Sequence, residues 1–405
     1  NEYSETVTLI DRNEDNVPLP ALRLRSLPPY PFALLTQRVR ELNAQGFDVI
    51  GLDIGSPDLP PPEHVVEALE RSARHPGHHG YSGYKGTASF RDAVARYYAS
   101  RFNVTIDPDR QVLPLIGSKE GIVNLGLAYM DTGDIALMPD IGYPSYAQGA
   151  HMAGGHEHLL PIRESGGYLI DFDAISPEIA SKAKLLWLNY PHNPTGATAE
   201  LDFYQRAVDF CAKYDILLAS DNPYVDVTFD GYRASSVLEC EGAVNSAVEF
   251  MSFSKTFNMA GWRLGAAVGS AEAIKMLLQV KSNIDSGHFH AIYDAGIAAL
   301  DQTPRTWLEQ RNAVYQRRRD RILDVLPQIG LRALRPKGSL YVWAEVVNKQ
   351  AADYVEQALL NAHVSIAPGE IYGPGGRSYV RLSVGISDER LEQALERLKS
   401  WYTSR

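Results

Sequence analysis

One lysine stands in a segment whose composition favours a reactive amine. Lys255 lies in segment 252–263, SFSKTFNMAGWR, directly after an apolar run. A lysine that reacts as a nucleophile needs surroundings that lower its pKa, or a covalent bond to a carbonyl compound. Ser252 and Ser254 share a face if the strand extends that far, and with Arg263 they can surround a phosphate group. A lysine after a strand is more often a surface residue, but the complete segment favours a reactive lysine at position 255.

Two other segments place polar side chains where an apolar run ends. Segment 189–196, NYPHNPTG, precedes an expected helix, and segment 219–224, ASDNPY, follows another run. The carboxyl ends of parallel strands are where α/β proteins bind ligands. Taken alone, segment 189–196 reads as a turn, and Asp221 could merely cap a helix.

A phosphate and a carboxylate each have a candidate binding segment. Segment 116–121, IGSKEG, lies between an expected strand and an expected helix, where backbone N–H groups suit a phosphate. It has the spacing of neither a P-loop nor a dinucleotide-binding loop. Arg381 stands in segment 378–383, SYVRLS, within an otherwise apolar strand. A guanidinium there is costly unless it meets an anion, internal or bound.

The elements that position these residues alternate between apolar runs and amphipathic stretches. Strands that are apolar throughout and separated by helices imply a mostly parallel sheet covered by helices on both faces. We therefore predict an α/β fold with a large domain at residues 48–301. The expected strands are 49–54, 112–116, 135–138, 185–188, 216–219, 247–252 and 264–268, and the expected helices are 63–74, 89–101, 119–130 and 201–214.

The pattern of apolar and charged residues changes after Thr303–Pro304, where a long charged helix is expected to begin. A smaller α/β domain is expected at residues 302–405, and residues 1–47 are expected to form an N-terminal arm and the start of the small domain. Helices are predicted at about 307–326 and 351–362, strands at 340–343 and 379–382, and a last helix with an apolar face formed by Leu391, Ala394, Leu395 and Leu398.

Composition excludes several classes of protein. The 405 residues are 45% hydrophobic and 22% charged, as in globular proteins, which argues against disordered, collagenous and coiled-coil chains. The formal net charge is −10, without a basic block, so neither nucleic acid nor an anionic membrane is an expected partner. Small molecules and copies of the chain itself are the expected partners.

Cysteine and histidine usage indicates a cytoplasmic protein without a metal site. Cys211 and Cys240 are far apart and read as reduced thiols rather than as a disulfide framework. No apolar run approaches the ~20 residues that span a bilayer. His75, His78 and His79 cluster in sequence, but their spacing and the absence of an acidic partner fit no metal site well, so solvated loop residues are expected.

Taken together and in order, these segments resemble the class I/II aminotransferases, a family of fold-type I pyridoxal-phosphate enzymes. The similarity runs from segment 27–30, LPPY, to the C-terminus. Any one segment alone would be weak support, whereas five in the same order are specific. The resemblance implies pyridoxal 5'-phosphate as cofactor, amino transfer between an L-amino acid and a 2-oxo acid, and a homodimer with shared active sites.

The resemblance also implies roles for the catalytic residues. Lys255 matches the lysine that binds the cofactor covalently and, once displaced by substrate, moves the proton between the substrate Cα and the cofactor C4′. Asp221 matches the carboxylate that keeps the pyridine nitrogen protonated. Tyr224 and Asn193 match the donors to the cofactor's phenolic oxygen.

Further residues match the family's contacts to cofactor and substrate. Tyr143 matches the aromatic side chain that stacks on the cofactor ring, and Tyr81 matches the tyrosine that reaches the phosphate of the neighbouring subunit. The matches to the phosphate cup are Ser118, Lys119, Ser252 and Arg263, the first two partly through their backbone, and Ser254 is a further candidate for binding the cofactor. The implied substrate contacts are Arg381 for the α-carboxylate, with Gly55 and Asn193 beside it, and Tyr30 and Asn283, which could cross between subunits or merely pack there.

Segments 281–287, KSNIDSG, and 117–121, GSKEG, resemble the branch that contains LL-diaminopimelate aminotransferases and aspartate aminotransferase-like bacterial enzymes. Two alternatives stay open at this point. A carbon–sulfur β-lyase on the same fold would share Lys255, Asp221 and Arg381. A regulator with an aminotransferase-like body would need a basic DNA-binding segment, for which the N-terminal arm is too short and too acidic.

Overall fold

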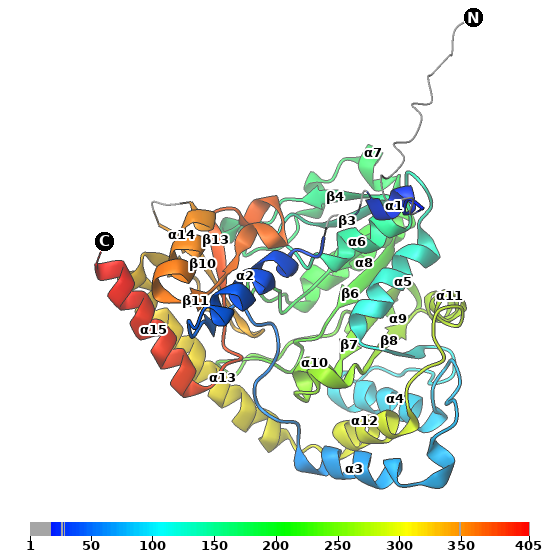
Figure 1. The fold of residues 1–405 in the computed structure, drawn as a ribbon. Helices are drawn as coiled ribbons and strands as arrows, with labels where there is room; N and C mark the ends of the chain where they lie inside the picture. Colours follow the sequence, from blue (N-terminus) through cyan, green and yellow to red (C-terminus); the bar gives the residue numbers. More distant parts are fainter. Residues whose placement is uncertain (1–17, 26, 28, 348–349, 405) are drawn as a thin grey trace, which may run out of the picture.

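The structure, a computed structural model, describes residues 18–25, 27, 29–347 and 350–404, so residues 1–17 of the predicted arm and Pro28 lie outside the described residues. Its centre is a seven-stranded sheet of order β2-β8-β7-β6-β5-β3-β4 (Figure 1). The strands are β2 (Val112–Leu115), β3 (Ile135–Pro139), β4 (His156–Leu160), β5 (Ala183–Leu188), β6 (Leu217–Asp221), β7 (Ala247–Ser252) and β8 (Gly265–Gly269).

The sheet is mostly parallel, as the sequence predicts. Strands β4, β3, β5, β6 and β7 pair in parallel, and β8 runs antiparallel to both β7 and β2. Parallel strands of this kind are buried on both faces, which explains their unbroken apolar runs. Their carboxyl ends meet at one edge, where the segments with candidate site residues follow them.

Helices cover both faces of this sheet. Successive side chains of β5 point to opposite faces, so Leu185 and Leu186 enter different cores. The core on the side of Leu186 includes α4 (Ala88–Phe102), α8 (Leu201–Tyr214) and α12 (His290–Gln302), and that on the side of Leu185 includes α5 (Ser118–Tyr129), α6 (Ser145–Met152) and α11 (Ala271–Lys281). Outside α12 lies α3 (Glu63–Ala73).

A second, smaller sheet stands beside the first, at the left of Figure 1. It is antiparallel, with order β12-β13-β10-β9, and has its own core, which includes Val342, Leu382 and Leu395. Its strands are β9 (Leu331–Ala333), β10 (Tyr341–Val346), β12 (Ala367–Pro368) and β13 (Tyr379–Ser383), and its helices are α13 (Arg305–Val325), α14 (Ala351–Gln357) and α15 (Asp388–Thr403). The predicted apolar face of α15 is buried there.

The first expected strand differs from the structure. Only Ile50–Gly51 forms β1, which pairs in parallel with β11 (Val364–Ser365) and not with the seven-stranded sheet. Ile50 and Leu52 pack into the core of the second sheet, so the apolar side chains that predict a strand here are buried in that core. The remaining helices are α1 (Leu22–Arg25), α2 (Phe32–Ala44), α7 (Pro177–Ala180), α9 (Ala243–Ser246) and α10 (Phe253–Thr256).

Both cysteines are buried and free, at 3% exposure for Cys211 and 7% for Cys240. Burial raises the pKa of the Cys211 thiol well above its usual range, and burial also raises the pKa of Cys240, to about 11. Within the described ranges, none of the helices combines the length and the apolar character that crossing a bilayer requires.

Candidate active site

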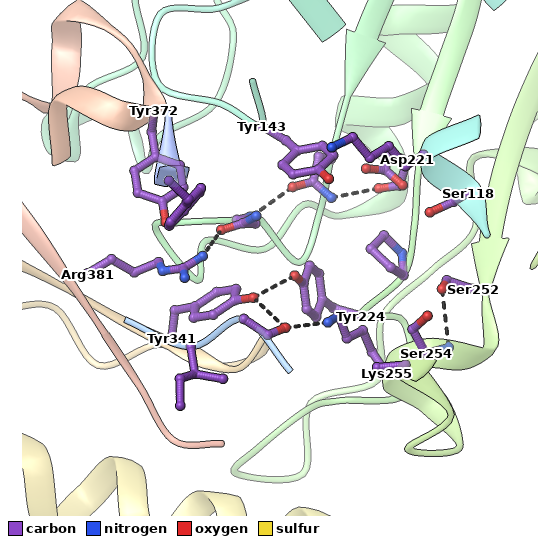
Figure 2. Close-up of a pocket in the computed structure, with 18 of the residues that line it drawn as sticks. Ser118, Tyr143, Asp221, Tyr224, Ser252, Ser254, Lys255, Tyr341, Tyr372 and Arg381 are labelled. Atoms are coloured by element: carbon purple, nitrogen blue, oxygen red, sulfur yellow. Dashed lines mark hydrogen bonds between the residues drawn. The ribbon is translucent and has the colours of Figure 1, made fainter. Parts of the chain in front are cut away.

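A cavity of about 370 Å³ opens where strands β5, β6 and β7 end, and residues of β10 and β13 close its other side (Figure 2). Segments that are remote in sequence meet in it. The sequence-predicted residues that line the cavity are Tyr30, Gly55, Ser118, Lys119, Tyr143, Asn193, Asp221, Tyr224, Ser252, Ser254, Lys255, Arg263 and Arg381.

Lys255 reaches this cavity from the short helix α10, which follows β7 directly. The strand ends at Ser252, whose hydroxyl accepts a hydrogen bond of 3.2 Å from the Ser254 N–H and so caps α10. The strand does not extend to Ser254, so the condition for a shared strand face is not met, but both serines line the cavity. Burial lowers the pKa of the Lys255 amine, which donates to the Gly55 carbonyl oxygen.

Asp221 is the last residue of β6 and lies deep in the cavity. The Tyr146 hydroxyl donates a hydrogen bond of 2.8 Å to Oδ2, whereas Oδ1 is buried and meets no hydrogen-bond donor in the described part of the chain. Burial raises the pKa of Asp221 to about 7. A buried carboxylate with an unused oxygen suits a cationic partner, since an opposite charge would restore its ionised form.

Two asparagines tie segment 189–196 to Asp221 and Arg381. The side chain of Asn189 donates to the Asp221 carbonyl oxygen at 2.7 Å and accepts from the Asn193 N–H at 2.8 Å. The Asn193 side-chain oxygen accepts from Arg381 Nη1 at 3.1 Å. Segment 189–196 is therefore more than an isolated turn, because it links the carboxylate end of the cavity to its guanidinium.

One end of the cavity has the features of an anion cup. Helix α5 begins at Ser118, and the preceding Gly117 has a φ of 73°. A Cβ on Gly117 would collide with the Arg263 guanidinium, so only glycine lets the arginine lie against the helix start. Unpaired N–H groups at this start, two serine hydroxyls and the guanidinium suit a phosphate. The Lys119 ammonium lies elsewhere, 3.9 Å above the Tyr30 ring.

Arg381 occupies the opposite side of the cavity, on β13. Its Nη2 donates to the Asp53 carbonyl oxygen at 2.7 Å, and its guanidinium carbon lies 3.8 Å from the centre of the Tyr341 ring. Its Nε is buried without a hydrogen-bond partner among the described residues. A buried guanidinium bonded to neutral oxygens and turned toward a cavity is suited to a carboxylate ligand.

Several residues of the site were not predicted from the sequence. The Tyr341 hydroxyl lies 3.0 Å from the Tyr224 hydroxyl and donates to the Gly55 carbonyl at 3.3 Å. Burial alone would raise the pKa of Tyr341, but the charges of Arg381 and Lys255 outweigh it and lower the pKa below its usual value. The other lining aromatic residues missed are Phe32 and Tyr372. The available signal was position: Tyr341 stands on the strand paired with that of Arg381.

The predicted inter-subunit residues have different positions. Tyr81 is 92% exposed and Asn283 donates to the Gln279 carbonyl oxygen, and neither lines the cavity of its own chain. Tyr30 instead lies in the cavity of its own chain, under Lys119.

These groups fit pyridoxal 5'-phosphate. The unused Asp221 oxygen suits a protonated ring nitrogen, the cup at Ser118 and Arg263 suits the phosphate, and Lys255 lines the same cavity. The charges of the cavity are thus complementary to a ligand that has a cation at one end and an anion at the other.

Comparison with known proteins identifies the family. Residues 48–398 match the sequence profile described as aminotransferase class I and II. The chain belongs to this family. It is 45% identical over 380 residues to the LL-diaminopimelate aminotransferase of Moorella thermoacetica, covering 94% of this chain and 97% of that protein. The LL-diaminopimelate aminotransferase of Aquifex aeolicus is 42% identical over 93% of this chain and 98% of its own.

Solved structures agree with this assignment. Substrate-bound BacF from Bacillus subtilis is 36% identical and superposes with a TM-score of 0.90, over 95% of this chain and 98% of that one. The aspartate aminotransferase of Thermus thermophilus is 28% identical, with a TM-score of 0.88 over 95% of this chain and 100% of that one.

The protein is therefore a pyridoxal-phosphate-dependent aminotransferase that moves an amino group between an amino acid and a 2-oxo acid. When bound, the cofactor supplies an electron sink for the pair released from the substrate Cα–H bond. The polypeptide supplies binding, orientation and a group for proton movement, and the comparisons give no support to the β-lyase alternative.

Proposed function

We propose that this aminotransferase takes LL-diaminopimelate as amino donor and 2-oxoglutarate as acceptor, with aspartate as the second candidate donor. The observation that carries the proposal is the 42–45% identity, over 93–94% of the chain, to proteins named LL-diaminopimelate aminotransferase. Aspartate aminotransferases among the solved structures are less similar, at 27–28% identity.

The charges of the cavity support a donor with two carboxylates. Four cationic side chains line it: Lys119, Lys255, Arg263 and Arg381. If Arg381 binds the α-carboxylate and Lys255 and Arg263 serve the cofactor, Lys119 is left for a second carboxylate. Its ammonium lies above the Tyr30 ring, and it forms no ion pair with a carboxylate of the described residues. A cation without a counter-ion in a cavity favours an anionic ligand.

The proposed roles of the site residues follow their positions. Lys255 bonds to the cofactor and then moves the proton at the substrate Cα. Asp221 holds the ring nitrogen protonated, Tyr143 covers the ring, and Tyr224 and Asn193 donate to its phenolic oxygen. Residues around the start of α5, with Ser252, Ser254 and Arg263, bind the phosphate.

We also propose a cytoplasmic homodimer with shared active sites. Tyr81 projects into solvent, away from its own cavity, and Leu22, Leu34 and Ile284 are large apolar side chains that the single chain leaves exposed. A second subunit that covers these side chains would remove apolar surface from water, which favours association. Tyr81 and Asn283 would then complete the site of the other subunit.

A donor–acceptor screen tests the substrate. The purified enzyme is offered LL-diaminopimelate, aspartate, alanine or phenylalanine with 2-oxoglutarate, and formation of glutamate is measured. We expect LL-diaminopimelate to give the highest kcat/KM, whereas a preference for phenylalanine would refute the dicarboxylate proposal. Pyruvate release without an acceptor, from a β-substituted amino acid, would indicate lyase activity.

Two variants test the roles within the same assay. Lys119→Met should raise KM for LL-diaminopimelate and leave that for alanine unchanged, because only the dicarboxylate meets Lys119. Borohydride reduction followed by peptide mass mapping should place the cofactor on Lys255. Label on another lysine would overturn the proposed chemistry independently of the substrate.

A further inference from the structure

A cluster of imidazole and carboxylate groups lies outside the active-site cavity, between the single turn η1 (Pro76–His78) and the start of α12. The rings of His78 and His290 stack with centroids 3.8 Å apart and an interplanar angle of 6°. Asp294 lies one turn after His290 on α12, on the same helix face, and it faces both rings. This acidic partner is not evident from the sequence, since Asp294 is far from His78 along the chain.

The distances within this cluster approach those of a metal centre. Asp294 Oδ2 lies 3.6 Å from His78 Nδ1, and Oδ1 lies 3.6 Å from His290 Nε2. Zinc binds nitrogen and oxygen at about 2.0–2.2 Å, which places two tetrahedral ligand atoms roughly 3.4 Å apart. All three candidate ligand atoms lie within 4.8 Å of one another, and the two stacked rings would turn out of their parallel arrangement for both nitrogens to point at a common ion.

The surroundings of Asp294 support a cation between these groups. No lysine or arginine among the described residues forms an ion pair with it. The buried Ser72 hydroxyl donates to Asp294 Oδ2 at 2.6 Å and holds the carboxylate in place. Such outer contacts orient ligands in metal sites. The Ser72 oxygen also lies 2.8 Å from His78 Nδ1, and that nitrogen would give up this contact and its proton on binding an ion. A cavity of about 330 Å³ reaches two of the three groups, since His78 and Asp294 line it together with Ser72 and Arg71, whereas His290 does not.

We propose that His78, His290 and Asp294 bind one divalent transition-metal ion of the Zn²⁺ type, with water in the remaining position. Two imidazoles and one carboxylate suit Zn²⁺, whereas Mg²⁺ and Ca²⁺ prefer all-oxygen sites. The ion would join η1 to α12. The Ser82 hydroxyl already donates to the His288 carbonyl at 2.8 Å in the same region, so the ion would stabilise the loop that carries Tyr81.

Titration of the untagged holoenzyme with Zn²⁺, followed by calorimetry, tests the proposal. We expect one ion per chain to bind at this cluster. His290→Gln and Asp294→Asn should each weaken it by about 100-fold or more, beyond what loss of an outer contact costs. The matched control is His151→Gln, which removes a partly exposed histidine paired with Glu157 elsewhere on the surface and should leave the affinity unchanged.

Thermal unfolding of the holoenzyme gives a second readout. Zn²⁺ should raise the unfolding temperature of the parent and of His151→Gln, because an ion that binds the folded chain stabilises it by mass action. It should not raise that of His290→Gln, whose partly exposed side chain can change without disturbing the core. No ion bound to the parent, or equal affinity in both cluster variants and the parent, would overturn the proposal. Neither result depends on the donor substrate.

Discussion

The carboxyl group of Asp221 bonds to Tyr146 through one oxygen and has its other oxygen buried without a donor among the described residues. We expect Asp221→Asn to retain cofactor and lose activity, because an amide cannot hold the ring nitrogen protonated. The loss of such an interaction costs about 3–4 kcal/mol of transition-state stabilisation, or a factor of 10²–10³ in kcat. Steady-state kinetics with a spectrum of the bound cofactor measure it, and a variant within a few-fold of the parent would refute the electron-sink role.

The same carboxyl group should make the cofactor-free protein sensitive to pH. Its pKa is 3.8 in the unfolded chain and about 7 in the folded one, owing to burial. The folded state therefore holds one more proton between these values, and the free energy of unfolding falls as pH rises from about 4 to about 7. The total effect is at most about 4 kcal/mol.

Urea unfolding of the cofactor-free protein at several pH values measures this dependence. Asp221→Asn should flatten it, because the amide does not titrate. Equal slopes in parent and variant would show that another group, such as the buried Glu249, is responsible.

Some residues of the site can be predicted from the sequence and others cannot. Lys255, Asp221 and Arg381 were predicted because each follows or interrupts an apolar strand. This signal is visible in the residues next to each of them in the sequence. Tyr341 was missed since its contact with Tyr224 joins residues 117 positions apart. Nothing in its own strand distinguishes a tyrosine that packs from one whose hydroxyl enters a cavity.

Helix α13 connects the second sheet to the segment that holds Lys255. Arg311, 3% exposed, donates from Nη1 to the carbonyl oxygens of Lys255 and Thr256, at 2.7 and 2.8 Å, and from Nη2 to that of Asp226 at 2.7 Å. Burial lowers the pKa of Arg311 to about 10. This guanidinium thus fixes the end of α10 and the loop after Tyr224 relative to each other.

We expect Arg311→Gln to lower both stability and kcat. The carbonyl oxygens of Lys255 and Thr256 would lose this donor and that of Asp226 would keep only Asn312, which costs about 2–5 kcal/mol of unfolding free energy. A displaced lysine lowers the rate by about tenfold or more. Urea unfolding and steady-state kinetics test both effects. Arg317→Gln, on the exposed side of the same helix, is the matched control, and equal behaviour of the two variants would remove Arg311 from this role.

Some helices and strands were also predicted correctly from the sequence, whereas others were missed or assigned to the wrong sheet. Strand β7 and helix α8 have the bounds that the sequence predicts, because apolar runs and amphipathic periods define them. Strand β4, HEHLL, was missed because an edge strand carries polar side chains that hide its alternation. Strand β1 was predicted as part of the large sheet, since an apolar run does not say which sheet it joins.

At the scale of the whole molecule, the position of Tyr81 makes the shared site testable. In the proposed dimer, Lys255→Ala and Tyr81→Phe would each damage a different part of the site. Mixed dimers of the two variants should contain one site with both native residues. After subunit exchange we expect more activity than either variant shows alone. If Tyr81→Phe alone is impaired and confirmed exchange restores nothing, Tyr81 serves its own chain.

Because both thiols are buried, the folded chain should react very little with thiol-reactive dyes. Cys211 and Cys240 expose little surface and hold their protons tightly, so a maleimide should leave them unmodified while the protein is folded. A single cysteine introduced at Asp173, whose side chain is 91% exposed, would then carry the only label. Donor- and acceptor-labelled batches would report subunit exchange by energy transfer, without removing either native cysteine.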